Sequence, residues 1–174
     1  MIVRGSGDLP DADVEALVNA VNCVGVMGKG LALQFKQRHP AYFSAYAAAC
    51  AAEDVRLGRV HVVSLDRHFI SFPTKGHFRS RSKLSDVADG LDDLARVIGE
   101  IGIRSVAVPP LGAGLGGLPW DDVQALIEEK LGRLDATIVV YSPESAARLR
   151  LQLLLTPRTL IGLEDEPPGR SQSR

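Results

Sequence analysis

Lys75 is the residue of this sequence best placed to act as a nucleophile. It lies in "FPTKGH", directly after a strand-like run and between Pro73 and Gly76. An isolated lysine is normally solvated and inert, but one at the carboxyl end of a strand can reach a ligand bound at that edge of a sheet. Its amine could there attack a sugar carbon. Asn22, which ends the run "ALVNAVN", offers an amide that either initiates a turn or both donates to and accepts from a sugar hydroxyl.

Two glycine-rich stretches are candidates for binding phosphate. They read "NCVGVMGKG" at 22–30 and "PPLGAGLGGLPW" at 109–120. Glycine lets the backbone approach a ligand closely, and N–H groups at such turns can cradle phosphate, although similar turns occur in α/β folds that bind none. Neither stretch matches the P-loop pattern, and "GAGLGG" lacks the context of a dinucleotide-binding fingerprint. ATP hydrolysis and ordinary dinucleotide binding are therefore not indicated.

A short basic stretch follows the lysine. Its members are His77, Phe78, Arg79 and Arg81, with Lys83 close behind. They form either a solvated charged loop or a local rim for nucleic-acid phosphates, in which Phe78 could stack on a base. The net charge of −1 gives no general attraction to nucleic acid but does not forbid such a rim.

The elements that must position these residues alternate along the chain. Strand-like runs are predicted at 16–21, 60–65, 69–72, 105–108 and 137–141. Helical patterns are predicted at 28–37, 40–52, 84–99 and 119–131, with a last helix opening at Ser142. Ser85 and Asp86 supply the chemistry of a helix start. This alternation predicts an α/β fold with helices on both faces of a sheet.

Length and composition suggest one domain over 1–155 and a tail or truncated linker, poorly ordered, at 156–174. Two cysteines without a CxxC pair indicate neither a disulfide framework nor a metal site. No apolar run approaches the roughly 20 residues that cross a bilayer. We expect a soluble cytoplasmic monomer that needs no metal or cofactor.

Taken together, five stretches resemble a macrodomain, and most closely the macrodomain of the DarG antitoxin type. They are "GDL", "ALVNAVNCVGVMGKGLALQFK", "FPTKGHFRSRS", "PPLGAGLGGLPW" and "IVVYSP". The resemblance implies a three-layer α/β/α fold with a central mixed, mostly parallel sheet that binds ADP-ribose. DarG-like macrodomains remove ADP-ribose from thymidine in single-stranded DNA and so reverse DarT toxins. Modified DNA and a DarT-type toxin are thus the expected partners.

The resemblance also assigns roles to residues. It implies that Asp8 and Leu9 recognise adenine, that Asn22 holds the distal ribose, and that Lys75 takes part in catalysis. Tyr141 would pack on the adenine, or be only a tyrosine at the edge of the core. The remaining implied ligand contacts are Gly25, Val26, Met27, Gly28, Gly30, Leu31, Thr74, Leu111, Gly112, Ala113, Gly114, Leu115 and Gly116.

Two departures from the related families bear on the mechanism. Gly116 stands where terminal ADP-ribose protein glycohydrolases carry an Asp, so a mechanism that needs that carboxylate is not expected. DarG proteins also carry a further domain, so the sequence is expected to be an excised or a stand-alone macrodomain. Hydrolysis of ADP-ribose esters on proteins or metabolites, and binding of ADP-ribose without catalysis, remain alternatives.

Overall fold

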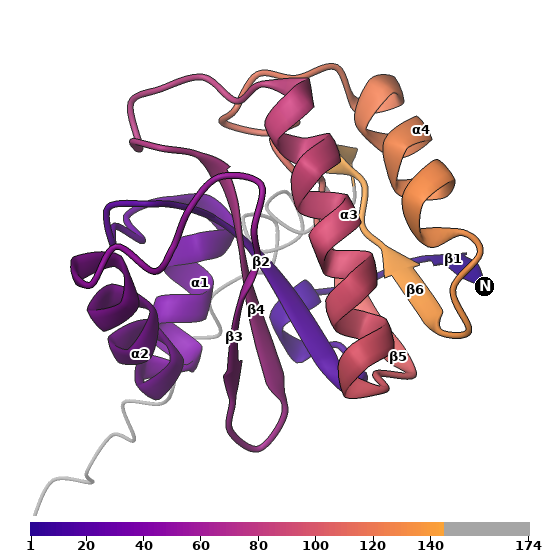
Figure 1. Ribbon diagram of the computed structural model, residues 1–174, viewed down its shortest axis with the longest axis horizontal. Coiled ribbons are helices and arrows are strands. Elements are labelled where there is room, and N and C mark those ends of the chain that lie inside the picture. Colours follow the sequence, from indigo (N-terminus) through magenta and orange to yellow (C-terminus); the bar gives the residue numbers. More distant parts are fainter. Residues whose placement is uncertain (145–174) are drawn as a thin grey trace, which may run out of the picture.

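The computed structural model describes residues 1–144 (Figure 1). Its elements are β1 (Ile2–Arg4), a 3-10 turn (Leu9–Asp11), β2 (Ala16–Asn22), α1 (Gly30–Arg38), α2 (Pro40–Ala51), β3 (His61–Ser64), β4 (His68–Lys75), α3 (Leu84–Ile101), β5 (Ser105–Val108), α4 (Trp120–Leu131) and β6 (Thr137–Val140). Pro143 and Glu144 are helical, as predicted for the start of a last helix. The rest of that helix, the end of the predicted domain and the predicted tail at 156–174 lie outside the described residues.

The six strands form one mixed sheet in the order β1-β6-β5-β2-β4-β3. β3 runs antiparallel to β4, and the other neighbouring strands are parallel. The carboxyl ends of β6, β5, β2 and β4 therefore point to the same edge of the sheet, and the loops that follow them gather there.

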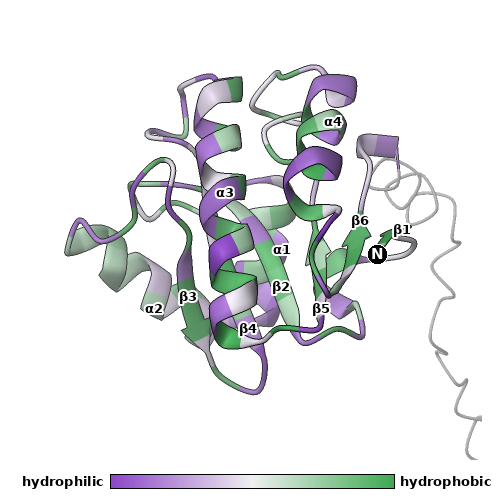
Figure 2. Ribbon diagram, turned by 45° about the vertical axis from the view of Figure 1, so that its right-hand side comes forward, coloured by the Kyte–Doolittle hydropathy of each residue, from purple (hydrophilic) through white to green (hydrophobic). Residues whose placement is uncertain are grey.

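Alternating strand residues fill two cores, one on each face of the sheet. Ala16 and Val18 of β2 join a core with α3 and α4, whereas Leu17 and Val21 join a core with α1 and α2. Figure 1 shows these two helix pairs on opposite sides of the sheet, and Figure 2 shows mostly apolar strands between helices with mixed faces. The predicted three-layer α/β/α architecture is confirmed.

The structure corrects several predicted boundaries. β1 was not predicted, because three residues are too few to show an alternating pattern. β4 extends to Lys75, so this lysine belongs to the strand itself. The prediction that Ser85 caps α3 is wrong: Lys83 is the N-cap residue, and its side chain makes no capping hydrogen bond. Within residues 1–144, no helix is long and apolar enough to cross a membrane.

Candidate functional site

Asn22 and Lys75 are neighbours at the carboxyl ends of the two central strands. The register of β2 and β4 shifts at this point, with Val21 opposite Pro73 and Asn22 opposite Lys75. Thr74 is therefore an extra residue in β4, as in a β-bulge. Bulges next to functional sites re-aim side chains. Here the bulge places the residue predicted to bind the ribose opposite the residue predicted to act in catalysis.

The Asn22 side chain organises the loop that follows it. Its Oδ1 accepts from the backbone N–H groups of Val24, at 3.0 Å, and Val26, at 3.3 Å, while its Nδ2 donates to the Val26 carbonyl at 2.6 Å. The Tyr46 hydroxyl donates to the Asn22 carbonyl at 2.8 Å and lies 3.2 Å from Oδ1. Burial, and then the nearby Cys50 thiol, raise the pKa of Tyr46, so its hydroxyl remains a donor. The predicted turn-forming role of Asn22 is thus present in the structure.

The first glycine-rich loop has one buried anchor and several exposed groups. Gly25 and Gly30 have φ values of 76° and 58°, a conformation that favours glycine. Met27 is 2% exposed, and its sulfur accepts a hydrogen bond from the buried Asn19 amide. Its side chain therefore anchors the loop to the core. Val26 is 39% exposed, and Gly28 and Lys29 are also exposed, so this part of the loop is open to a ligand.

The second glycine-rich loop meets the first through Leu115. This side chain is 73% exposed, and its Cδ1 lies 3.9 Å from where a Cβ on Gly30 would stand. The Leu115 carbonyl accepts a hydrogen bond from Lys75 Nζ at 3.5 Å. Leu115 therefore contacts the positions predicted to bind diphosphate on one side and to catalyse on the other.

No side chain can be placed at Gly116. A Cβ there would collide with Ser82 Oγ and with the carbonyl oxygen of Gly112. Ser82 is buried, its N–H donates to the Gly116 carbonyl at 3.1 Å, and its hydroxyl has no partner among residues 1–144. Gly112 has a φ of 71° and faces Leu118 and the same serine. The packing at this position therefore excludes an aspartate, in agreement with the glycine that the sequence places there.

Asp8 and Tyr141 lie together at the far end of this edge. The Asp8 carboxylate pairs with Arg38, which also binds Asp11. Burial, and then the charge of Asp8, raise the pKa of Tyr141. The Tyr141 ring packs directly against Gly5, where an added Cβ would lie 2.5 Å from the ring. The ring is 6% exposed, so little of it is open to a ligand in this structure.

The basic stretch forms a stack of side chains beside Lys75. The His77 and Phe78 rings lie 4.2 Å apart, and the Arg79 guanidinium lies 5.5 Å from the Phe78 ring centre. Phe78 is 42% exposed. Arg81 instead points toward Gly117, since its guanidinium nitrogens lie about 3.5 Å from the Cβ position there. The stretch thus divides between an exposed platform and a cation on the second glycine-rich loop.

The predicted site residues follow the order of the strands along one edge. Tyr141 follows β6, the loop at 109–117 follows β5, Asn22 ends β2, and Lys75 ends β4. Three residues that contact this set were not predicted, namely Tyr46, Ser82 and Arg38. Only Tyr46 had a usable signal, because it is four residues after Tyr42 on one face of the helical run at 40–52.

Comparison with known proteins identifies relatives of the whole site region. The DNA ADP-ribosyl glycohydrolase of Mycobacterium tuberculosis is 54% identical over 154 residues, which are 85% of this chain and 44% of that protein. The solved macrodomain of its DarG has a TM-score of 0.80 and 54% identity, covering 82% of this chain and 98% of that chain. The structure of Thermosipho africanus DarTG in complex with ADP-ribose has a TM-score of 0.76 and 32% identity; the match covers 79% of this chain and 40% of that chain.

The match to the family is broad. Residues 18–127 match the family described as Macro domain, and this range contains Asn22, Lys75 and both glycine-rich loops. The chain spans about half the length of the curated relatives it matches. The resemblance predicted from the sequence motifs is confirmed. This chain belongs to the macrodomain family.

Proposed function

We propose that this protein is a DNA ADP-ribosyl glycohydrolase that removes ADP-ribose from thymidine in single-stranded DNA. Relatives in Mycobacterium tuberculosis and Thermus aquaticus carry the name DNA ADP-ribosyl glycohydrolase. A related structure, Thermosipho africanus DarTG, was solved in complex with ADP-ribose. These likenesses extend over most of this chain and support the same ligand here.

The pairing of Asn22 with Lys75 carries the proposal. A protein that only binds ADP-ribose has no need of an amine beside the distal ribose. In this chain the lysine is the strand partner of the asparagine assigned to that ribose. Its Nζ already reaches the second glycine-rich loop, at Leu115, so it lies between the two loops assigned to the ligand. An amine fixed at this position can act on the anomeric carbon or on the departing base.

The proposed reaction breaks the bond between the anomeric carbon of the distal ribose and a thymine ring nitrogen. Water supplies the hydroxyl that the ribose gains and the proton that the base gains. As an ammonium, Lys75 would stabilise negative charge on the leaving base. As a free amine, it would instead attack the sugar and form a transient adduct that water then hydrolyses. Asn22 would orient the ribose with the Nδ2 hydrogen not used by Val26.

The target strand would leave the site over the stacked platform of His77, Phe78 and Arg79. This platform begins two residues after Lys75 and exposes an aromatic ring backed by a cation. Such a surface stacks on bases with little sequence preference. Arg81 would lie nearer the diphosphate, because it points toward Gly117. A DarT-type toxin is the proposed source of the modification, since a Thermosipho africanus relative is named as a fusion of the transferase with the glycohydrolase.

The decisive experiment measures ADP-ribose release from two substrates, single-stranded DNA bearing ADP-ribosyl-thymidine and a protein bearing ADP-ribosyl-glutamate. Wild type, Lys75→Ala and the control Lys36→Ala, an exposed lysine of α1, are compared. We expect release from DNA with the wild type and the control, and a loss of at least 100-fold with Lys75→Ala, in the range by which one positioned catalytic group acts.

Other outcomes would change the assignment. Release from the protein alone would make the enzyme an ester hydrolase. ADP-ribose binding without release from either substrate would make it a binding module. Full activity of Lys75→Ala would remove the lysine from the mechanism.

A further inference from the structure

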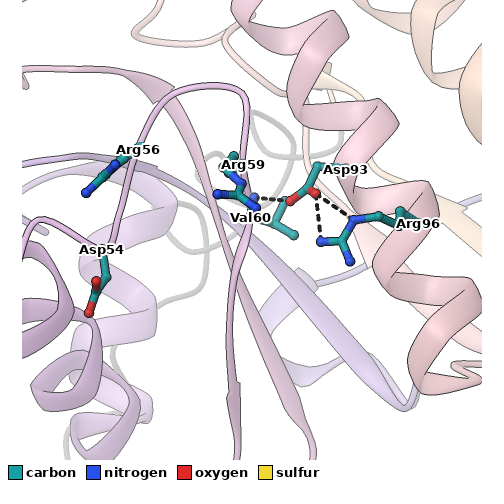
Figure 3. Close-up of a pocket in the computed structure, with 6 residues that line it drawn as sticks. All are labelled: Asp54, Arg56, Arg59, Val60, Asp93 and Arg96. Atoms are coloured by element: carbon teal, nitrogen blue, oxygen red, sulfur yellow. Dashed lines mark hydrogen bonds and ion pairs between the residues drawn. The ribbon is translucent and has the colours of Figure 1, made fainter.

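A hollow lined by arginines lies beside the start of β3, the neighbour of the strand that ends at Lys75. It has a volume of about 280 Å³ and lies between the connection from α2 to β3 and the middle of α3. Figure 3 shows its lining, which consists of Asp54, Arg56, Arg59, Val60, Asp93 and Arg96. None of these residues belongs to the site described above.

In two of the three arginines, most guanidinium N–H groups have no hydrogen-bond partner among residues 1–144. The Arg59 side chain has no hydrogen bond or ion pair within residues 1–144, and Arg56 uses only its Nε, which donates to the Glu53 carbonyl at 2.7 Å. Both side chains are exposed. Arg96 is different, because it is paired with Asp93 and Glu100. Arg56 and Arg59 therefore offer planar donor arrays of the kind that bind phosphate oxygens.

The carboxylates of the hollow do not cancel this charge. Asp93 is occupied on both oxygens, since Oδ1 binds Arg96 and Oδ2 accepts from the Val60 N–H at 2.8 Å. Asp54 lies at the exposed end of the lining, next to the end of α2. The three arginines and two aspartates leave a net positive lining, and Arg56 and Arg59 supply most of its spare donors.

The turn that carries these arginines touches the candidate catalytic loop. Arg59 N–H donates to the Arg56 carbonyl across a turn with Gly58 at a φ of 75°. At the tip of the turn, the Leu57 backbone lies close enough to the thiol of Cys23, the residue after Asn22, to lower its pKa against the larger effect of burial. The turn that carries the arginines is thus next to the loop assigned to the distal ribose.

The strand order of the sheet indicates the direction in which the assigned ligand extends, which is from β6 toward β3. Along the sheet edge, the adenine position follows β6, the diphosphate position follows β5, and the ribose and lysine lie at the ends of β2 and β4. The next position is the start of β3, which the turn at 56–59 precedes. A DNA strand continues in two directions from the modified thymidine, so one arm can pass over the platform of His77, Phe78 and Arg79 while the other passes toward this hollow.

We propose that Arg56 and Arg59 hold a backbone phosphodiester of the DNA strand whose thymidine occupies the site. This inference rests on the proposed function. It separates recognition of the strand from recognition of ADP-ribose, because phosphate contacts position a strand without reading its sequence.

The test compares Arg56→Glu/Arg59→Glu with the control Arg104→Glu/Arg133→Glu, which makes the same charge change at two other exposed positions. Each is assayed on a modified ten-nucleotide DNA and on ADP-ribosyl-thymidine alone. We expect the first variant to raise KM at least tenfold on the oligonucleotide, with unchanged kcat/KM on the nucleoside. The control should match the wild type on both substrates, and circular dichroism checks that all variants fold.

A binding measurement keeps this test separate from the fate of the proposed function. Fluorescence anisotropy of the same modified oligonucleotide needs no turnover. The slope of log affinity against log salt should decrease by about 0.7 in the first variant, since one phosphate contact on a single strand contributes about 0.7. An unchanged slope, or equal losses on oligonucleotide and nucleoside, would overturn the proposed phosphate site. If the variant shows the expected decrease in slope but the wild type releases no ADP-ribose, the phosphate site stands and only the proposed hydrolase function is refuted.

Discussion

Asn22 and Lys75 are cross-strand partners at the last paired position of β2 and β4, immediately after a register shift. The shift is not a local defect, because the strands continue in contact beyond it through the Cys23 N–H, which donates to the Gly76 carbonyl at 3.0 Å. The two residues are therefore held on both sides by backbone hydrogen bonds. Pre-organisation of this kind is what a catalytic amine requires.

Tyr46→Phe should disturb the site although Tyr46 is not itself assigned to the ligand. The substitution removes the donor that serves the buried Asn22 carbonyl and Oδ1. An unsatisfied buried acceptor costs about 1–3 kcal/mol, so we expect a lower melting temperature and slower ADP-ribose release. Tyr42→Phe is the matched control, because Tyr42 bonds Ser71 and Asn19 and not Asn22. It should lose stability but keep its affinity for ADP-ribose in calorimetry. Equal loss of affinity in both variants would contradict a specific role for Tyr46.

Gly116→Ala should displace the second glycine-rich loop. The new methyl group collides with Ser82 Oγ and with the backbone of Gly112, and backbone cannot move aside cheaply. We expect ADP-ribose affinity to fall at least tenfold and the melting temperature to decrease. Gly114→Ala, where nothing lies within 4 Å of the new Cβ, should fold as the wild type does. If Gly116→Ala retains full affinity, the loop does not line the ligand as assigned.

Gly90→Ala tests the packing of α3 on β4. The added Cβ would stand 2.5 Å from Cζ of the fully buried Phe72. Alanine gains about 1 kcal/mol in helix propensity, but overpacking a core costs about 1–3 kcal/mol, so a net loss of stability is expected. Gly99→Ala on the same helix meets no atom within 4 Å and should be stabilising by up to about 1 kcal/mol. Urea unfolding of the two variants would show opposite shifts, and a stabilised Gly90→Ala would contradict the packing described.

Stability should fall as the pH decreases below 6.5, in part through His61. Burial lowers the pKa of His61 from its ordinary value of 6.5, against a smaller opposing effect of Asp54. Its Nδ1 is buried without a partner in the part of the chain described. Below pH 6.5 the unfolded chain binds this proton more readily than the folded protein, so protonation favours unfolding. His61→Gln should weaken the decrease in melting temperature between pH 7 and pH 5, whereas His77→Gln, at an exposed position, serves as the control. An unchanged decrease in His61→Gln would exclude His61 as a contributor.

The sequence predicts most of the sheet because its central strands are continuous apolar runs. β2 and β5 are buried on both faces, and their boundaries differ from the prediction by at most one residue. The bulge at Thr74 could not be predicted, since register depends on which strands pair and where. The capping role proposed for Ser85 failed for a similar reason, because a serine one residue inside a helix looks the same in sequence as one at its start.

The candidate site is predicted less evenly than the fold. Asn22, Lys75 and the glycine-rich loops carry recognisable motifs because their chemistry restricts residue type. The supporting contacts carry none: Arg38 reaches Asp8 from α1, and Ser82 reaches Gly116 from the loop just before α3, across 30 and 34 positions of chain respectively. Such long-range pairs arise only once the elements are packed.

The strand order of the sheet also determines which substitutions should be energetically coupled. Tyr141 follows β6, which β5 and β2 separate from the strand that ends at Lys75, whereas Asn22 and Lys75 end neighbouring strands. In double-mutant cycles, changes at distant positions add, and changes at contacting positions do not. We therefore expect substitutions at Tyr141 and at Lys75 to have additive effects, whereas a substitution at Asn22 should change the effect of one at Lys75.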